Sequence, residues 1–554
     1  MESASTLAYA RQFYHPRFPS LLQGSVTHLS AQPLPPLSLP IERKIQLEEA
    51  FPHTFFQKPV QFVEEDSLQC QPRLLRVGLF FSGGPAAGGH NVITGLLDGL
   101  RVFHTESILY GFEGGPSGLL AEKYLLLNEE GVEPYRNQGG FDLLGSGRTK
   151  IESKEQLESA YEVSCKLKLD GLVVVGGDDS NTNAALMAEF FAHKGSKTSI
   201  VGVPKTIDGD LQNALIPISF GFDTACKVYS ELIGNIARDA LSARKYTHFV
   251  RVMGRSASHI ALECALQTHP NLTLIGEEIY QRGESLETVV ERIASLILKR
   301  AERGKMYGLI LIPEGILEFI PEIRTLICEL NRLLTESSLD REEKGWDALF
   351  DSLSAASRSC FSSLPREVAR QLLSERDPHG NVSLARIDTE KLLIGKVEER
   401  LQEIGKSTSY KVTFQPQGHY LGYEGRAALP SNFDANYCYT LGKTALALIV
   451  HGYNGYLSSV GKLHLPPEEW EVGACPLSHL LDWEERRGRQ KAVIAKKLVD
   501  LEGEPFRTFA MQRKQWEEED HYLHPGPMQF FGDHSLTDTP PLSLSLRHAC
   551  SLRN

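Results

Sequence analysis

The sequence predicts an α/β protein with two domains, each built on a mainly parallel sheet covered by helices, and a helical insertion in the second domain. Three observations carry this prediction. The 554 residues are too many for one ordinary core. Between residues 74 and 312, near-continuous apolar runs alternate with helical patterns, as in parallel sheets that are covered on both faces. After about residue 318, long charged helical stretches replace that alternation.

Five apolar runs are predicted to form strands. They are residues 75–81, 171–175, 198–203, 247–253 and 307–312. A helix is predicted at 92–100, directly after the first strand, and insertion helices are predicted at 324–334 and 389–400. In such sheets ligands bind beyond the carboxyl ends of the strands, and the glycine-rich turns of this chain fall there.

The predicted organisation has four parts. They are an N-terminal extension (1–72), a first α/β domain (73–250), a second α/β domain (251–523, with the insertion at about 318–411) and a C-terminal tail (524–554). We expect part of the C-terminal segment to pack back on the first domain. The extension is expected to be flexible or to lie along the surface, because a proline cluster near its end breaks any amphipathic helix.

Composition excludes several classes of protein. The hydrophobic fraction of 41% and charged fraction of 23% are typical of globular proteins, and no apolar run approaches the ~20 residues of a membrane span. A net charge of -12 argues against general nucleic-acid binding. The nine cysteines are scattered and form no C-x-x-C pair, which indicates a reducing, cytoplasmic setting. An acid-poor start between Ser3 and Ile41 leaves organelle targeting as the second option.

The first glycine-rich turn, residues 81–91, lies between the first predicted strand and its helix. Glycines let the backbone approach a ligand, and a helix N-terminus offers free N–H groups, so the turn favours phosphate over an ordinary connection. The turn is not a Walker A loop, because Gly88 is followed by Gly89 and His90 where Lys and Ser or Thr are required.

The second turn places Asp178 and Asp179 side by side after two glycines. Asp179 or Ser180 is predicted to cap a helix over residues 183–191. Two adjacent carboxylates exceed the needs of capping, and Mg²⁺ binds carboxylate oxygen together with phosphate oxygen. We therefore expect at least one of the two aspartates to be linked to a metal ion.

The third turn, residues 203–211, brings Lys205, Asp208 and Asp210 together. A lysine neutralises charge on a transferring phosphoryl group, and an aspartate takes the proton from an attacking hydroxyl. A charged Asp-Gly turn without function is the alternative. The three turns follow three strands of one predicted sheet, so we expect them to converge.

A further set of charged residues follows later strands. Arg255 and Arg426 are natural bidentate partners for a phosphate, and Glu314 is suited to accept hydrogen bonds from sugar hydroxyls. As a set they predict a polyol phosphate site next to the phosphate-donor site.

With these residues assembled, the chain resembles the phosphofructokinase family, and within it the long pyrophosphate-dependent form, nearest the plant catalytic beta subunit. The match runs from about Phe51 to Gln529. It includes residues 139–142, 176–183, 204–210, 219–227, 259–270 and 422–439. The first loop departs at Pro85 and Ala87, where relatives have Gln and Pro, but its glycines are kept.

The resemblance implies two phosphofructokinase-type domains and reversible phosphoryl transfer from pyrophosphate to the C1 hydroxyl of fructose 6-phosphate, a glycolytic and gluconeogenic step that uses Mg²⁺. It implies that Asp208 is the general base, that Lys205 stabilises the transferring group, that Asp178 is the Mg²⁺ site and that Gly83 contacts pyrophosphate. The residues implied for the sugar phosphate or its loop are Thr206, Ile207, Met253, Gly254, Arg255, Glu314, Tyr423, Glu424, Gly425 and Arg426.

The resemblance also implies an oligomer, because the family completes its site across a subunit interface. Lys245 and Tyr246 match the pair supplied by the neighbouring chain, in a homo-oligomer or a hetero-oligomer with a related regulatory subunit. Arg148 fits a further phosphate-bridging arginine of the family.

Two alternatives are weighed against this function. ATP-dependent 6-phosphofructokinases have glycine where this chain has Asp179, and a smaller residue at Lys205. A carboxylate ~4 Å from a nucleotide phosphate costs ~4 kcal/mol at an effective dielectric of ~20, so ATP is disfavoured. A regulatory, non-catalytic subunit should have lost Lys205, Asp208 and Asp178, and all three are present. A dehydrogenase lacks support because no G-x-G-x-x-G follows the first strand.

The basic segment 486–497 is predicted to be a helix. A solvated helical face is the favoured interpretation. Binding of an anionic regulator such as fructose 2,6-bisphosphate, an activator of the plant relatives, is the second.

Overall fold

The computed structural model divides the chain into two compact units. It describes residues 6–36, 39–67, 69–255, 257–336, 346–374, 382–407, 413–486 and 489–551. Unit 1 comprises Met1–Ala225, Arg426–Lys497 and Met528–Pro540, and unit 2 comprises Cys226–Gly425, Leu498–Pro527 and Pro541–Asn554. The division differs from the expected boundary at residue 250, which falls inside strand β8 (Thr247–Val252) of unit 2.

A nine-stranded sheet forms the centre of unit 1. In sheet order its strands are β1 (Leu29–Pro33), β2 (Val60–Glu64), β13 (Glu471–Pro476), β12 (Tyr456–Gly461), β7 (Ser199–Pro204), β6 (Gly171–Gly176), β3 (Arg76–Phe81), β4 (Ile108–Phe112) and β5 (Tyr124–Leu127). From β12 to β4 neighbouring strands are parallel, and towards both edges they are antiparallel. The predicted strands 75–81, 171–175 and 198–203 are confirmed as β3, β6 and β7.

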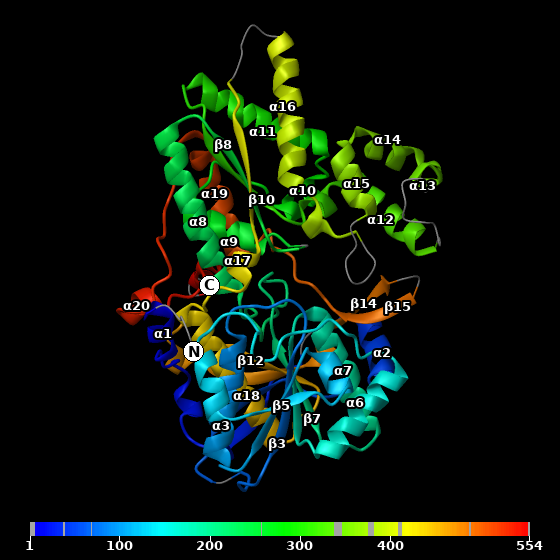
Figure 1. Ribbon diagram of the computed structural model, residues 1–554, viewed down its shortest axis with the longest axis vertical. Helices are drawn as coiled ribbons and strands as arrows, with labels where there is room; N and C mark the ends of the chain where they lie inside the picture. Colours follow the sequence, from blue (N-terminus) through cyan, green and yellow to red (C-terminus); the bar gives the residue numbers. More distant parts are fainter. Residues whose placement is uncertain are drawn as a thin grey trace. The chain divides into compact units, whose positions relative to one another are not determined.

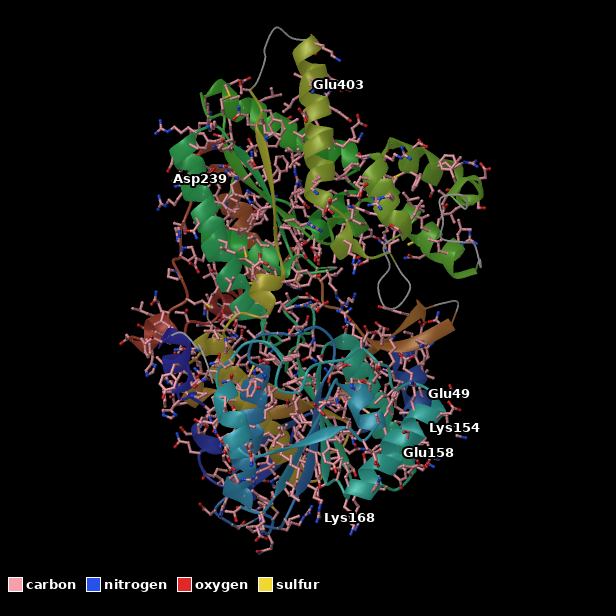
Figure 2. The ribbon with its side chains drawn as sticks, in the orientation of Figure 1. Glu49, Lys154, Glu158, Lys168, Asp239 and Glu403 are labelled. Carbon is pink, nitrogen blue, oxygen red and sulfur yellow. The ribbon has the colours of Figure 1, made fainter. Side chains whose placement is uncertain are left out.

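Helices cover both faces of this sheet. In Figure 1, α3 (Gly89–Phe103) and α18 (Asn432–Val450) lie on one face, and α6 (Lys154–Leu167) and α7 (Asp178–His193) lie on the other. The backbones of α3 and α18 nearly touch, because a Cβ on Gly95 would lie 2.2 Å from the Tyr439 carbonyl oxygen. The outer face of α6 carries Lys154 and Glu158, whose side chains point away from the sheet (Figure 2).

The N-terminal residues are built into unit 1 rather than lying loosely on it. Strands β1 and β2 pair with each other, and β2 pairs with β13. The guanidinium of Arg11 is buried and lies 5.1 Å from the centroid of the Phe530 ring. Arg17 forms ion pairs with Glu468 and Asp538. This differs from the expected flexible or surface extension, because short edge strands with polar residues give no apolar run.

Unit 2 is built on a four-stranded parallel sheet. Its strands, in order, are β11 (Pro416–Leu421), β8 (Thr247–Val252), β10 (Gly308–Pro313) and β9 (Leu272–Thr273). Its main helices are α8 (Phe222–Ala243, whose first residues belong to unit 1), α9 (His259–Thr268), α10 (Gly276–Arg282), α11 (Leu286–Glu302), α19 (Glu504–Glu518) and α21 (Leu542–Ser551). The predicted strands 247–253 and 307–312 are confirmed as β8 and β10.

Five helices separate β10 from β11 in the described chain. They are α12 (Pro321–Glu336), α13 (Trp346–Ser352), α14 (Ala355–Ser363), α15 (Arg366–Ser374) and α16 (Thr389–Ser407). Leu330, Leu372 and Leu393 of these helices share one buried core with Ile310 of β10. The helices of this segment are therefore part of the core of unit 2.

The predicted basic helix over residues 486–497 is wrong. Residues Leu481–Arg486 (β14) and Arg489–Ile494 (β15) pair as antiparallel strands of unit 1. Val493 and Ile494 are buried, whereas the Lys491 ammonium donates to Glu152 Oε2 at 2.6 Å. Both interpretations of the segment, a solvated helical face and a helical site for an anionic regulator, lose their basis, since the charges do not form one helical face.

The remaining helices are short or peripheral. They are α1 (Thr6–Gln12), α2 (Ile41–Ala50), α4 (Pro116–Leu120), α5 (Glu129–Val132), α17 (Tyr423–Arg426) and α20 (His534–Thr537). Over the described ranges, every helix is too short or too polar to cross a lipid bilayer.

Candidate active site

The first glycine-rich loop joins β3 to α3 in unit 1. The Gly83 N–H donates to the Gly147 carbonyl oxygen at 2.9 Å, and Ser146 Oγ donates to the Gly83 carbonyl oxygen at 2.6 Å. Gly83 has φ +86°, and a Cβ there would lie 3.1 Å from Nζ of Lys205. The loop thus has a shape that only glycine adopts without strain. The exposed Arg148 follows directly after Gly147.

Asp178 and Asp179 open helix α7, directly after β6. The prediction that Asp179 or Ser180 caps this helix is wrong, because α7 begins at Asp178 with Gly177 as its N-cap residue. Ser180 Oγ instead donates to Ser82 Oγ at 2.8 Å, which links the second loop to the first. Both aspartates are half-buried in the first turn, where the helix dipole stabilises negative charge.

Lys205 ties the third loop to both of the others. Its N–H donates to the Gly176 carbonyl oxygen at 2.9 Å, at the end of β6. Its ammonium donates to the Gly84 carbonyl oxygen at 2.8 Å, in the first loop. Only 6% of Lys205 is exposed, so its charge acts in a poorly hydrated setting. Strands β7, β6 and β3 are neighbours, and the predicted convergence of their three turns is confirmed.

Thr206, Ile207 and Asp208 complete this loop. The Asp208 N–H donates to Thr206 Oγ1 at 3.1 Å, which closes a tight turn before Gly209 at φ +75°. Ile207 is buried, and Asp208 is 7% exposed. A carboxylate held on a short turn three residues after an ammonium provides a base and a cation at one loop.

Asp178 and Asp179 are also the carboxylates available for Mg²⁺. Within the described residues, no cluster of three or more His, Cys, Asp or Glu side chains could hold a metal ion. Mg²⁺ is usually bound by one or two carboxylates that are completed by substrate phosphates and water. Two carboxylates beside a phosphate-type loop therefore fit this ion.

A cavity of about 540 Å³ adjoins Asp179 in unit 1. Asp179 and Leu186 of α7 line one side, and Trp483 and Lys491 of the β14–β15 hairpin line another. The volume lies in the range of small-ligand pockets, roughly 300–1,000 Å³. The Asp179 carboxylate thus borders a cavity of small-ligand size.

In unit 2, the turn after β8 carries Met253, Gly254 and Arg255. Oε2 of Glu314 accepts from the Gly254 N–H at 3.3 Å and from the Arg255 N–H at 2.9 Å. Its Oε1 accepts from the Tyr420 hydroxyl at 2.7 Å. Glu314 is 1% exposed and holds this turn in place, a role that the sequence did not predict.

The Tyr420 hydroxyl keeps its proton and donates it in a hydrogen bond to Glu314. Burial, and then the Glu314 carboxylate itself, raise the pKa of the Tyr420 phenol far above its usual value. The Arg251 guanidinium lies 4.0 Å from the centroid of the Tyr420 ring. The Tyr420 hydroxyl thus fixes the carboxylate that in turn holds the backbone of Arg255.

The segment 422–426 divides between the units. In unit 2, Tyr229 donates to the Gly422 carbonyl oxygen at 2.5 Å, and a Cβ on Gly425 would lie 2.4 Å from the Tyr229 ring. Tyr423 and Glu424 between them are exposed. Arg426 belongs to unit 1, where a Cβ on Gly84 would lie 3.0 Å from its Nη1.

Lys245 and Tyr246 lie apart from the other unit 2 residues. They precede β8, whereas Met253 to Arg255 follow it, so the two groups occupy opposite ends of one strand. Six strand residues span roughly 20 Å at ~3.3 Å per residue. The Lys245 ammonium is exposed and lies 4.8 Å from the centroid of the Tyr246 ring. Within one chain, this pair cannot join the turn after β8.

Sequence reasoning missed the serines that hold the loops together. Ser82 follows β3 directly, Ser146 stands between two glycines, and Ser180 lies in the first turn of α7. Each is a small hydroxyl beside glycine or aspartate in a turn, and that is the only signal in the sequence that marks them.

The chain is similar in sequence to proteins of one known family. A family model described as phosphofructokinase matches residues 76–449. A Treponema pallidum protein named pyrophosphate–fructose 6-phosphate 1-phosphotransferase is 48% identical over 567 residues, covering 100% of this chain and 98% of its own. An Arabidopsis thaliana protein named subunit beta 2 of that enzyme is 51% identical over 502 residues, covering 90% of this chain and 88% of its own.

A solved structure supports the fold. The crystal structure of a pyrophosphate-dependent phosphofructokinase from Marinobacter aquaeolei aligns with a TM-score of 0.53 and 17% identity, over 85% of this chain and 96% of that chain. At this identity the similarity concerns the arrangement of helices and strands alone.

Proposed function

The chain belongs to the phosphofructokinase family, and from that premise we propose that it transfers a phosphoryl group reversibly between pyrophosphate and the C1 hydroxyl of fructose 6-phosphate. One observation in unit 1 carries this proposal. Lys205 forms hydrogen bonds both to the glycine loop that contains Gly83 and to the end of β6, directly before Asp178 and Asp179. A buried ammonium, two carboxylates and a glycine loop suit a small anionic donor that binds with Mg²⁺. The relatives named above carry the same activity in their names.

The chemical step follows from the third loop. Asp208 takes the proton of the C1 hydroxyl, the hydroxyl oxygen forms a bond to one phosphorus of pyrophosphate, and the bridging P–O bond breaks to release phosphate. Lys205 neutralises charge that develops on the transferring group. Mg²⁺, which we place at Asp178, would neutralise further charge on the phosphate oxygens when bound.

The donor is chosen by Asp179. A nucleotide would place its next phosphate against this carboxylate, and two unit charges ~4 Å apart repel by ~4 kcal/mol at an effective dielectric of ~20. Pyrophosphate ends before that position. The cavity of about 540 Å³ that Asp179 borders supports an electrostatic filter, because this carboxylate faces open space rather than packed side chains.

Unit 2 supplies the residues for fructose 6-phosphate. We assign its phosphate to Arg255 on the turn after β8, and its further contacts to Met253, Gly254 and Tyr423 to Gly425 of the same unit. Arg426 belongs to unit 1, and its role toward this phosphate stays a prediction from the sequence. Glu314 contributes by holding the N–H groups of Gly254 and Arg255, and a direct contact of Glu314 with the sugar stays a prediction.

A second chain is part of this proposal. Lys245 and Tyr246 lie at the opposite end of β8 from Arg255, so we assign them to the site of a neighbouring subunit. The partner is a second copy of this chain or a related regulatory subunit, since the Arabidopsis relatives are named as beta and alpha subunits. The scattered cysteines, which form no C-x-x-C pair, support a reducing compartment, for which we propose the cytoplasm.

A donor-swap assay in both directions tests the proposal. Purified protein with Mg²⁺ and fructose 6-phosphate is expected to consume pyrophosphate and to leave ATP unused. With fructose 1,6-bisphosphate and phosphate it is expected to form pyrophosphate. Turnover of ATP without use of pyrophosphate would overturn the donor, and absence of turnover with either donor would favour the regulatory, non-catalytic alternative.

A further inference from the structure

Helix α18 holds the segment 218–224 through three side chains, all within unit 1. Asp434 Oδ1 accepts from the Gly221 N–H at 3.0 Å, and its Oδ2 accepts from the Thr224 N–H at 2.9 Å and from the Thr224 hydroxyl at 2.5 Å. The Tyr437 hydroxyl donates to the Ile218 carbonyl oxygen at 2.7 Å. Ser431, the N-cap residue of α18, donates to Asp223 Oδ2 at 2.5 Å.

The held segment in turn holds the third loop. Phe220 pairs with Lys205 as an isolated parallel bridge, and its N–H donates to the Pro204 carbonyl oxygen at 3.1 Å. Ser219 Oγ donates to the Thr206 carbonyl oxygen at 2.8 Å. This segment therefore holds the backbone on both sides of Lys205, up to Thr206, two residues before Asp208.

The same helix end also touches the first loop. A Cβ on Gly88 would lie 2.4 Å from Sγ of Cys438 and 3.4 Å from the Asp434 carbonyl oxygen. Gly221, whose N–H Asp434 holds, faces the first loop as well, since a Cβ there would lie 2.6 Å from Cβ of Ala86. The start of α18 is thus a common support for the loops proposed to bind the donor and to carry the base.

Asp434 is an unfavourable group to bury, which marks it as more than a helix-capping residue. It has no exposed surface, and a second buried carboxylate, Asp223, lies close to it. Burial, and then Asp223, raise the pKa of Asp434 to about 7. Its oxygen atoms nevertheless accept three hydrogen bonds from one short segment. The buried carboxyl therefore serves to hold that segment in place.

We propose that Asp434 is a positioning residue for phosphoryl transfer. It fixes Gly221 and Thr224, and through the pairing of Ser219 and Phe220 it sets the place of Lys205 and Asp208. This inference rests on the proposed function for the roles of Lys205 and Asp208, but the mechanical link from Asp434 to their loop stands on the contacts alone.

Two variants and a matched control test the link. Asp434→Asn keeps the shape but turns one acceptor into a donor, and Thr224→Val removes the hydroxyl that Asp434 holds. Thr440→Ala is the control, because Thr440 is an equally buried residue of α18 whose hydroxyl bonds only the Asn436 carbonyl oxygen of the same helix. Thr224→Ser, which restores the hydroxyl, is the conservative rescue.

Hydrogen exchange on the full-length protein is the first readout. Amides of residues 205–210 and 219–224 are expected to exchange about tenfold faster in Asp434→Asn and in Thr224→Val, and at the wild-type rate in Thr440→Ala and Thr224→Ser. If Asp434→Asn fails to fold, Thr224→Val decides alone. Unchanged exchange in the loops of a folded Asp434→Asn or Thr224→Val variant overturns the inference.

Steady-state kinetics with pyrophosphate is the second readout. Displacement of the base and the lysine is expected to lower kcat by ~10- to 100-fold while KM for both substrates changes less than about threefold. A role in folding alone would lower the amount of folded enzyme and the melting temperature but would leave kcat per folded molecule unchanged, which overturns the inference. If the wild-type protein turns over no pyrophosphate, the proposed function fails, while hydrogen exchange still decides the mechanical link.

Discussion

The Lys205 ammonium donates a hydrogen bond to the Gly84 carbonyl oxygen at 2.8 Å, so the loop after β7 is tied to the loop after β3. Both loops belong to unit 1, and Lys205 is almost fully buried. Gly83 leaves room for this contact, because a Cβ there would lie 3.1 Å from the ammonium nitrogen. A cation is therefore fixed at the glycine loop by the protein itself, and preorganised charge of this kind lowers the reorganisation needed in a transition state.

Replacement of Lys205 by Met should lower kcat with pyrophosphate by ~10² to 10³, because a preorganised charge on the transferring group is lost. Lys194→Met is the matched control, since Lys194 ends α7 on the surface and pairs only with Glu158 and nearby rings. Initial rates at saturating substrates measure the effect. Wild-type kcat in Lys205→Met would remove the assigned role.

Replacement of Asp208 by Asn should lower kcat by ~10² to 10⁴, because the general base is lost while the side chain keeps its shape. Asp170→Asn is the control. Asp170 is a structural carboxylate that accepts from the Arg76 N–H at 2.8 Å and pairs with Arg73, so its loss should affect stability more than turnover. Equal kinetic effects of the two substitutions would contradict the assignment of Asp208.

Replacement of Asp178 by Asn should raise the Mg²⁺ concentration that gives half-maximal rate by at least about tenfold, because one anionic ligand becomes neutral. The measurement is a Mg²⁺ titration of the pyrophosphate-dependent rate after treatment with a chelator. Asp142→Asn, at an exposed carboxylate in the same unit, should titrate like the wild type. An unchanged Mg²⁺ requirement in Asp178→Asn would place the ion elsewhere.

The strands and turns of the centre of each sheet could be predicted from the sequence, because buried parallel strands such as 171–175 and 307–312 are continuous apolar runs. The convergence of Asp178 and Lys205 followed from the same logic. The edges could not be predicted: β1 and β2 are short antiparallel strands with polar residues, and such pairing depends on distant partners like β13.

Two local predictions failed for physical reasons. Asp179 and Ser180 are residue types that often cap helices, but α7 begins earlier, with Gly177 as a cap that makes no side-chain hydrogen bond. The spacing of the basic residues in 489–494 fits one face of a helix, yet this segment forms a strand that pairs with β14. The pairing depends on contacts in the folded protein rather than on the local sequence pattern. The roles of Glu314 and Asp434 in holding loops lie in long-range contacts that no local pattern contains.

Replacement of both Asp179 and Lys205 by Gly should shift donor preference from pyrophosphate towards ATP. Removal of the carboxylate takes away a repulsion of ~4 kcal/mol, and loss of the lysine side chain opens space beside the glycine loop. Asp179→Gly alone should shift less. The ratio of kcat/KM for ATP to that for pyrophosphate measures the change, and an unchanged ratio in the double variant would contradict the electrostatic filter.

We expect His248 to make the stability of the protein depend on pH. Its Nδ1 lies 2.9 Å from Nε2 of His419 on the neighbouring strand β11, and its Nε2 lies 4.0 Å from the carboxylate of Asp239, which projects from α8 (Figure 2). Burial first, and His419 second, lower the pKa of His248 to about 4, against 6.5 in the unfolded chain. Between these values the unfolded state binds more protons, so stability is fully present above pH 6.5 and falls as pH falls towards 4.

Replacement of His248 by Gln should therefore flatten the pH dependence of stability. At pH 5 the wild-type protein should have lost about 2 kcal/mol through this histidine, since each pKa unit corresponds to about 1.4 kcal/mol. Melting temperatures at pH 7.5 and pH 5 measure the effect, and the fall between them should be smaller in His248→Gln than in the wild type. An equal fall in His248→Gln and the wild type would show that His248 does not carry this pH dependence.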